Sequence, residues 1–262
     1  MQAQKFSRRV RAWYERVGRD LPWRRTRDPY RVLVSELMLQ QTQVSRVLGF
    51  YDKFLSRFPT LGDVGKARLT EVMRAWKGLG YYARARNLHA LARTLGEATL
   101  PDDPALLVKL PGIGAYTAGA IASFAYERRA ALVDTNVARV LLRVFAPRLD
   151  PRTSRGRRVA WAIAEATLPR TGRVAYTHNQ AVMELGATVC TARVRHCSRC
   201  PVRGLCATYE RSRNKIATGV SDTTGKFSRM SSSNPGKAAS AVRSTMKYST
   251  PRAISERTTG IV

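Results

Sequence analysis

The sequence predicts an all-α fold, and three observations support that prediction. From residue 6 to about residue 210 the apolar side chains recur at intervals of three and four residues, the spacing of one helix face. No stretch alternates between apolar and polar residues as a half-buried strand does. Residues that commonly begin or end helices stand where this apolar pattern starts or stops. With 44% hydrophobic residues among 262, the chain can bury a substantial core.

Apolar stripes and capping residues mark the individual helices in order. A two-turn stripe covers residues 33–38, and a second stripe covers residues 88–95. Asp103 followed by Pro104 predicts the N-cap and first residue of a short helix that runs to Leu110. Later, Asp134 is expected to cap a helix over residues 135–145, whose apolar residues follow the i, i+3, i+4, i+7 rule.

The balance of charge points to a polyanionic partner. The chain carries 46 Lys and Arg against 18 Asp and Glu, a formal charge of +28. Each phosphate met by a Lys or Arg releases condensed counterions, so nucleic acid is the first expected partner. No run approaches the roughly 20 apolar residues that a membrane span needs, and residues 1–19 lack the apolar core of a secretory signal. We expect a protein of the cytosol or nucleoid without a membrane partner.

The last segment, residues 211–262, differs in composition from the rest. It contains ten Lys and Arg, two acidic residues, ten Ser, seven Thr and only two aromatic residues. Such a segment cannot bury enough apolar surface to offset the entropy lost on ordering. We predict a disordered basic tail.

A hairpin between two helices is predicted at Leu110-Pro111-Gly112-Ile113-Gly114. Glycines allow a tight turn and a close approach to a ligand, and the start of the helix that follows offers free N–H groups. Gly112, Ile113 and Gly114 are therefore expected to contact the DNA backbone, which fixes register without reading sequence. An ordinary corner between two helices would use the same residue types and is the alternative.

All four cysteines lie within seventeen residues of each other. Cys190, Cys197, Cys200 and Cys206 give the pattern C-x6-C-x2-C-x5-C, which suits one metal or cluster better than disulfides that close long loops. Zinc ribbons normally supply two short Cys-x2-Cys pairs, and only Cys197 and Cys200 form one here. We therefore expect one [4Fe-4S] cluster as the cofactor.

Glu36 and Asp134 are the candidate catalytic carboxylates. Cleavage of an N-glycosidic bond needs an acid for the leaving base and a negative charge near the sugar, as paired carboxylates provide in glycosidases. Glu36 stands among apolar helix residues, and burial would raise its pKa. The first N–H groups of a helix would hold Asp134 ionised. A solvated glutamate and a plain helix cap are the alternatives.

These motifs together resemble a known family. The hairpin, the aspartate about twenty residues after it and the cysteine pattern resemble the helix-hairpin-helix base-excision DNA glycosylases that carry an iron-sulfur cluster. The segments Leu33 to Val44 and Gly78 to Asn87 resemble the adenine glycosylase (MutY-type) branch, and the resemblance covers about residues 8–210. The resemblance implies two domains, a six-helix domain over residues 28–130 and a cluster domain over residues 1–27 and 131–210.

The resemblance also implies roles for single residues near the scissile bond. Glu36 matches the general acid that protonates adenine, and Asp134 matches the carboxylate that stabilises the transition state. Asn136 matches an active-site asparagine, although Thr135 stands where many members have glycine. Tyr116 occupies the position where bifunctional relatives carry a lysine, and tyrosine cannot form a Schiff base. Strong strand cleavage is therefore not expected.

Further residues match positions that hold the everted nucleotide or fill its gap. Arg19, Arg24 and Gln180 match positions around the everted base, and Gln41 and Tyr81 match those that fill the gap in the duplex.

Tyr81 and Tyr82 allow two interpretations of their place in the fold. Tyr81 and Tyr82, next to Arg84 and Arg86, suit base stacking and phosphate contact. Tyrosines packed in the core are the alternative.

The resemblance implies a monomeric enzyme that hydrolyses the N-glycosidic bond of adenine mispaired with 8-oxoguanine or guanine in double-stranded DNA. Full-length relatives usually have a further C-terminal domain that helps to recognise 8-oxoguanine. A thymine glycosylase acting on T·G mismatches and an iron-sulfur protein that binds DNA without catalysis are the alternatives.

Overall fold

The computed structural model describes residues 1–217, and this part of the chain is helical, as predicted. Its α-helices are α1 (Gln2–Val17), α2 (Pro29–Leu39), α3 (Val44–Arg57), α4 (Leu61–Lys66), α5 (Leu69–Ala75), α6 (Ala83–Leu95), α7 (Pro104–Leu107), α8 (Ala115–Phe124), α9 (Thr135–Phe145), α10 (Ser154–Thr167), α11 (Gly172–Thr188) and α12 (Ala207–Ala217). Within these residues there is no strand, and an isolated bridge joins Cys190 to Arg195. No described helix is long and apolar enough to cross a membrane.

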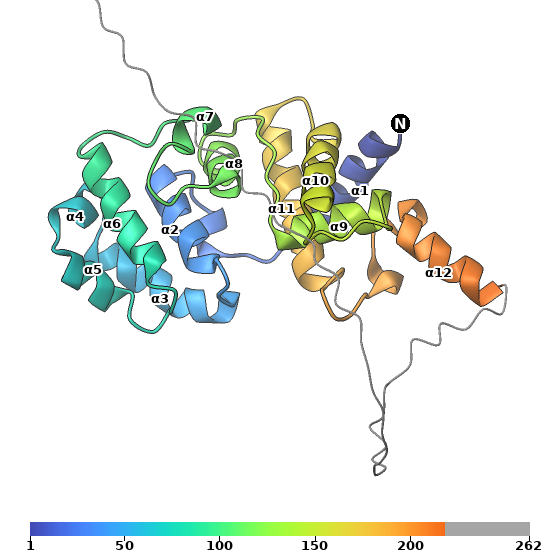
Figure 1. Cartoon of the computed structure of the whole chain (residues 1–262), viewed down its shortest axis with the longest axis horizontal. Coiled ribbons are helices and arrows are strands. Elements are labelled where there is room, and N and C mark those ends of the chain that lie inside the picture. Colours follow the sequence, from blue (N-terminus) through green and yellow to red (C-terminus); the bar gives the residue numbers. More distant parts are fainter. Residues whose placement is uncertain (218–262) are drawn as a thin grey trace, which may run out of the picture. The chain divides into compact units, whose positions relative to one another are not determined.

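The helices pack in two groups that share a continuous core. Helix α2 packs against α3, α6 and α8, and α6 also packs against α4 and α5. In the second group α11 packs against α1 and α9, and α9 also packs against α10 and α12. Helix α8 of the first group contacts α11 of the second, and Figure 1 shows these two helices where the groups meet. The apolar core runs through both groups, and the domain boundaries at residues 28 and 130 stay a prediction.

Helices α2 and α8 are the inner helices that carry the site. Asp28 caps α2 by accepting a hydrogen bond from the backbone N–H of Arg31, with Pro29 at the first helical position. Tyr30 and residues 32–38 of α2 and residues 117–124 of α8 are buried, so neither helix presents a broad polar face to water. Gly119 permits close packing of α8, because an added Cβ would lie 2.2 Å from the carbonyl oxygen of Ala131.

The hairpin before α8 forms where it is predicted, with one difference. The helix capped by Asp103 ends at Leu107 rather than at Leu110, because residues 108–110 continue in tighter turns whose N–H groups bond to carbonyls four and three residues back. Gly112 adopts a φ of +76°, and a Cβ at this position would lie 2.5 Å from the Cβ of Asn87. Only glycine meets both the backbone and the packing requirement here.

Two other expectations concern the later helices. Asp134 caps α9, as predicted, by accepting a hydrogen bond of 2.6 Å from the backbone N–H of Val137. The start of the expected disordered tail at residue 211 is wrong, because α12 continues to Ala217. Residues 211–217 extend a helix that already begins at Ala207, so they need no core of their own to become ordered. The rest of that segment, residues 218–262, lies outside the described residues.

Candidate active site

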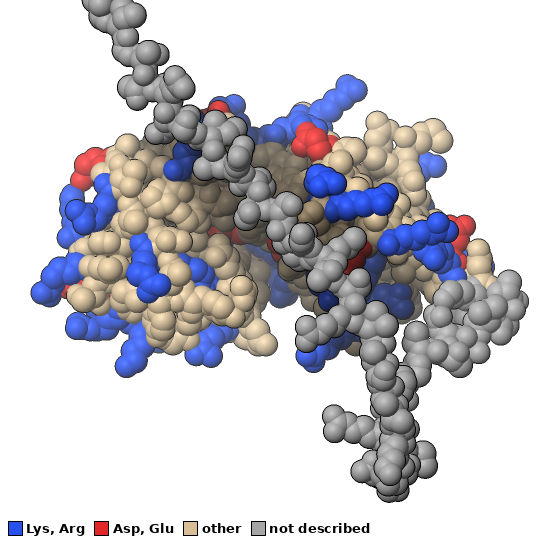
Figure 2. Space-filling view, in the orientation of Figure 1, with Lys and Arg blue, Asp and Glu red and all other residues tan. Residues whose placement is uncertain are grey.

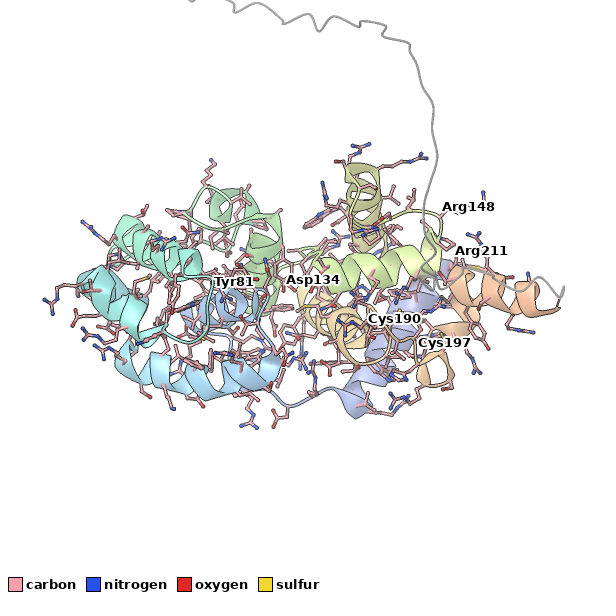
Figure 3. The ribbon with its side chains drawn as sticks, turned by 60° about the horizontal axis from the view of Figure 1, so that its bottom comes forward. Tyr81, Asp134, Arg148, Cys190, Cys197 and Arg211 are labelled. Carbon is pink, nitrogen blue, oxygen red and sulfur yellow. The ribbon has the colours of Figure 1, made fainter. Side chains whose placement is uncertain are left out.

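One cavity brings together most of the residues predicted for the site. It is lined from α2, the hairpin, α8, α9 and α11, and from the segment between α1 and α2. The predicted residues along it are Arg19, Arg24, Glu36, Gln41, Gly112, Gly114, Tyr116, Asp134, Asn136 and Gln180. Figure 3 shows Asp134 between Tyr81 on one side and the loop with Cys190 and Cys197 on the other. Residues from distant parts of the sequence thus surround one space.

Glu36 lines this cavity and is buried. Only 4% of its surface is exposed, and Tyr116 donates a hydrogen bond of 2.7 Å to its Oε2 atom. Burial raises the pKa of Glu36 to about 7, although the hydrogen bond from Tyr116 lowers it. The nearby Asp134 raises this pKa further, and Arg24 lowers it. Glu36 can therefore hold a proton near neutral pH, as an acid catalyst requires.

Asp134 faces the same cavity from the start of α9. Besides the bond from Val137, its Oδ2 accepts a hydrogen bond of 3.3 Å from the side-chain amide of Asn136. Burial nevertheless raises the pKa of Asp134 above its ordinary value, and these hydrogen bonds oppose the rise. The expectation that the N–H groups at the start of α9 hold Asp134 ionised stays a prediction, since these bonds lower its pKa while burial raises it. The charge of Asp134 also acts on Glu36, whose pKa it raises.

A buried glutamate organises the residues expected around the everted base. Glu184 accepts hydrogen bonds from Arg19 at 2.6 Å and from Arg24 at 2.8 Å. Its burial opposes ionisation, but the bonds from the two arginines hold its pKa below the usual value. Arg24 also donates to the Oε1 atom of Gln180, a residue that lines the cavity, at 2.9 Å.

Sequence reasoning missed Glu184. It lies four residues after Gln180 on α11, which places both on the same helix face, and that spacing could have identified it.

Gln41 and Tyr81 line a second hollow beside the main cavity, together with Gln40, Tyr82, Arg84 and Arg86. Tyr81 is 58% exposed and Tyr82 is also exposed, so the alternative that these tyrosines belong to the core is wrong. Arg86 is exposed, whereas Arg84 is 6% exposed. Contact of Arg84 with phosphate is therefore not supported, because its guanidinium is occupied by backbone carbonyl groups.

The hairpin presents backbone groups at the edge of the main cavity. Gly112 and Gly114 line it, whereas Ile113 is buried and anchors the turn in the core. Gly114 is the N-cap of α8 and no side chain caps the N–H groups of the first turn. These groups are free to meet an anion, and they lie next to Tyr116 on the same helix. Figure 2 shows Lys and Arg outnumbering Asp and Glu on the drawn face.

The four cysteines are free thiols, partly exposed, on the segment between α11 and α12. The guanidinium of Arg143 donates to the Sγ of Cys190 at 3.3 Å, and the thiol of Cys206 donates to the carbonyl of Arg143 at 3.4 Å. Burial raises the pKa of Cys200 to about 11, while a backbone N–H from Val202 lowers it. Among the described residues, no three His, Cys, Asp or Glu side chains are grouped so as to hold a metal ion.

The chemistry of these donors nonetheless suits a cluster of iron and sulfide. All the sulfurs come from one short loop, a cationic guanidinium lies beside one of them, and backbone N–H groups point at two others, Cys200 and Cys206. These N–H donors and the cation favour thiolate over thiol, against the burial that raises the pKa of Cys200 and Cys206.

Comparison with known proteins places the chain in a family. Residues 34–165 match the HhH-GPD superfamily base excision DNA repair protein. The chain belongs to this family. It is 45% identical over 214 residues to the adenine DNA glycosylase of Homo sapiens, an alignment that covers 76% of this chain and 38% of that protein. It is 45% identical over 198 residues to the adenine DNA glycosylase of Mycobacterium tuberculosis, covering 73% and 64% respectively.

Solved structures of HhH-GPD type share the fold. A thermostable thymine-DNA glycosylase superposes with a TM-score of 0.73 at 30% identity, covering 80% of this chain and 97% of that one. An endonuclease III in a non-covalent DNA complex superposes with a TM-score of 0.66 at 24% identity, covering 81% of this chain and 99% of that one. At this identity the similarity shows a shared fold and no more. The chain spans only 38% to 42% of the length of its mammalian relatives.

Proposed function

We propose that this HhH-GPD protein is a DNA N-glycosylase that hydrolyses the bond between adenine and deoxyribose where adenine is mispaired with 8-oxoguanine or guanine. The observation that carries the proposal is the pair Glu36 and Asp134 in one cavity, one able to hold a proton near pH 7 and the other fixed at a helix start. The adenine DNA glycosylases that the chain resembles support the choice of base.

In the proposed reaction the carboxyl group of Glu36 gives its proton to a ring nitrogen of the everted adenine. The electron pair of the N-glycosidic bond then leaves with the neutral base, and positive charge develops on the sugar. Asp134 in its ionised form stabilises that charge, and Asn136 and Val137 hold its carboxylate in place. Water adds to the sugar carbon, its released proton returns to the carboxylate of Glu36, and an abasic site is left. Tyr116 orients Glu36 and offers no amine for strand cleavage.

Binding of the duplex would use surfaces on both sides of this cavity. The free N–H groups at the start of α8 would hold a phosphate, while Gln41 and Tyr81 would fill the gap that the everted nucleotide leaves. Arg19, Arg24 and Gln180 would surround the adenine. We further propose that the protein acts as a monomer at the nucleoid.

We propose that Cys190, Cys197, Cys200 and Cys206 hold one [4Fe-4S] cluster. When bound, the cluster would tie the loop between α11 and α12 into one conformation and present its basic side chains to the DNA backbone. Purified protein should contain about four iron and about four sulfide per chain. One zinc without sulfide would contradict the assignment.

A second candidate is excision of thymine from T·G mismatches, which the structural similarity to the thymine-DNA glycosylase favours. The experiment that decides is a panel of duplexes with adenine or thymine opposite guanine or 8-oxoguanine, with the released base and strand nicking measured separately. Release of adenine alone, without nicking, is expected. Release of thymine alone would replace the proposal by the second candidate, and binding without release of either base would indicate a DNA-binding protein without catalysis.

A further inference from the structure

Two loops beside the cavity hold their backbones in a conformation that side chains other than glycine rarely adopt. Gln41 has a φ of +55° and Tyr81 a φ of +46°, and Glu127 is the remaining non-glycine residue of this kind in the described chain. Gln41 follows the end of α2, and Tyr81 precedes α6. Both line the second hollow, so two loops with unfavourable backbones form its rim.

The guanidinium of Arg84 forms hydrogen bonds to both of these loops. Its Nη1 donates to the carbonyl of Gln40 at 2.6 Å, and its Nη2 donates to the carbonyl of Gly80 at 2.9 Å. Its Nε donates to the carbonyl of Tyr81 at 3.3 Å, and both terminal nitrogens lie 3.3 Å from the hydroxyl of Thr42. One guanidinium therefore bonds to a residue on each side of Gln41 and to Tyr81 itself.

The same guanidinium also completes the end of α2, the helix that carries Glu36. Its Nη1 donates to the carbonyls of Leu37 and Met38 at 2.8 Å each. These carbonyls belong to the last turn of α2 and have no partner within the helix. A cation at this end also opposes the negative pole of the helix dipole.

Arg84 is not neutralised by a carboxylate. Among the described side chains it forms no ion pair, and the groups around its guanidinium are carbonyls, one hydroxyl and the rings of Trp76 and Tyr81. A buried cation is unfavourable unless hydrogen bonds satisfy it. The carbonyls can do so only if both loops keep their present shape, so the charge of Arg84 opposes any rearrangement of either loop.

We infer that Arg84 is a positioning residue for opening the duplex, which holds Gln41 and Tyr81 ready to enter the gap left by the everted nucleotide. This inference rests on the proposed function. Arg84 touches neither Glu36 nor Asp134 through any hydrogen bond or ion pair in the described structure, so it acts on base eversion rather than on bond cleavage. Lysine cannot replace it, because an ammonium group lacks the planar fork of five donors that reaches both loops.

The test compares Arg84→Lys with the wild type on two substrates. One is a duplex with adenine opposite 8-oxoguanine, and the other places the same adenine in a bubble of unpaired bases. We expect single-turnover excision from the duplex to fall by about tenfold to a hundredfold, the range for lost hydrogen bonds to a charged group. Excision from the bubble should fall by less than about threefold, because no base pair has to be opened. Equal losses on both substrates would overturn the inference.

A double-mutant cycle separates positioning from general destabilisation. If Arg84 acts through Gln41 and Tyr81, adding Arg84→Lys to a variant with both Gln41→Ala and Tyr81→Ala should slow duplex excision by less than about twofold beyond that variant alone. Multiplication of the effect of Arg84→Lys by the effect of that variant would overturn the inference. Arg93→Lys, the same change at an exposed position of α6, is the matched control and should behave as wild type.

Two further measurements keep the inference testable if Arg84→Lys folds poorly or the proposed chemistry is wrong. Thr42→Val removes one acceptor and keeps the cation, and it should lower duplex excision in the same direction by a smaller factor. A duplex with 2-aminopurine next to the target reports unstacking without any cleavage, and its fluorescence rise on binding should be smaller with Arg84→Lys. An unchanged rise would overturn the inference, whereas a wild type that excises from neither substrate would overturn the proposed function alone.

Discussion

Glu36 and Asp134 are both carboxylates and line the same cavity, yet they differ in the hydrogen bonds that they receive from the backbone. Glu36 lies inside α2, where the backbone N–H groups are used by the helix, and a tyrosine hydroxyl is its hydrogen-bond donor. Asp134 precedes α9 and receives one backbone N–H and one side-chain amide. Burial raises the pKa of both groups. Burial is the largest influence on both pKa values, and Asp134 differs from Glu36 in the additional N–H donors that lower its pKa.

The largest expected effect comes from Glu36→Gln, which removes the transferable proton and keeps the shape. Single-turnover excision should fall by about a thousandfold, within the usual range for a general acid. Binding to a mismatched duplex should persist, as a gel-shift measurement would show. Excision at the wild-type rate would remove Glu36 from the mechanism.

A somewhat smaller loss is expected for Asp134→Asn. Asparagine is as good a helix cap as aspartate, so α9 should stay intact while the negative charge is lost. Excision should fall by about a hundredfold to a thousandfold, as for other preorganised charge stabilisers. An unchanged melting temperature is the control, and a near-normal rate would leave Asp134 as a cap only.

The pH dependence of excision tests the state of Glu36 without a substitution. Its pKa is raised to about 7, so the protonated form dominates below that pH and is lost above it. The excision rate should therefore decline as pH rises through about 7, because Glu36 loses its single transferable proton there. A rate that stays level from weakly acidic to weakly alkaline buffers would contradict this assignment.

The smallest expected effect is that of Tyr116→Phe, which removes the hydroxyl that donates to Glu36. This hydrogen bond lowers the pKa of Glu36, so its loss should raise that pKa and move the decline of the excision rate to higher pH. The maximal rate should change by less than about tenfold, because the proton donor remains. Movement of the decline to lower pH would show that the hydroxyl stabilises the protonated acid instead.

Much of the fold could be predicted because its signals are local. The apolar spacing of helices, the cap at Asp134 and the glycine turn before α8 depend on a few neighbouring residues and appear in the structure. The length of the helix after Asp103 and the start of the tail were wrong by a few residues, since helix ends depend on which neighbours satisfy the last carbonyls. The family was indicated by motifs of the same local kind and is confirmed.

The sequence by itself determined which side chains are available to the site, namely a glutamate in an apolar helix, an aspartate at a helix start and a glycine hairpin. Only the tertiary structure decided their charge and their partners. Burial of Asp134, the pairing of Glu184 with two arginines and the binding of both rim loops by Arg84 depend on segments far apart in the chain. Desolvation and hydrogen bonding act through space, so no local pattern of residues encodes them.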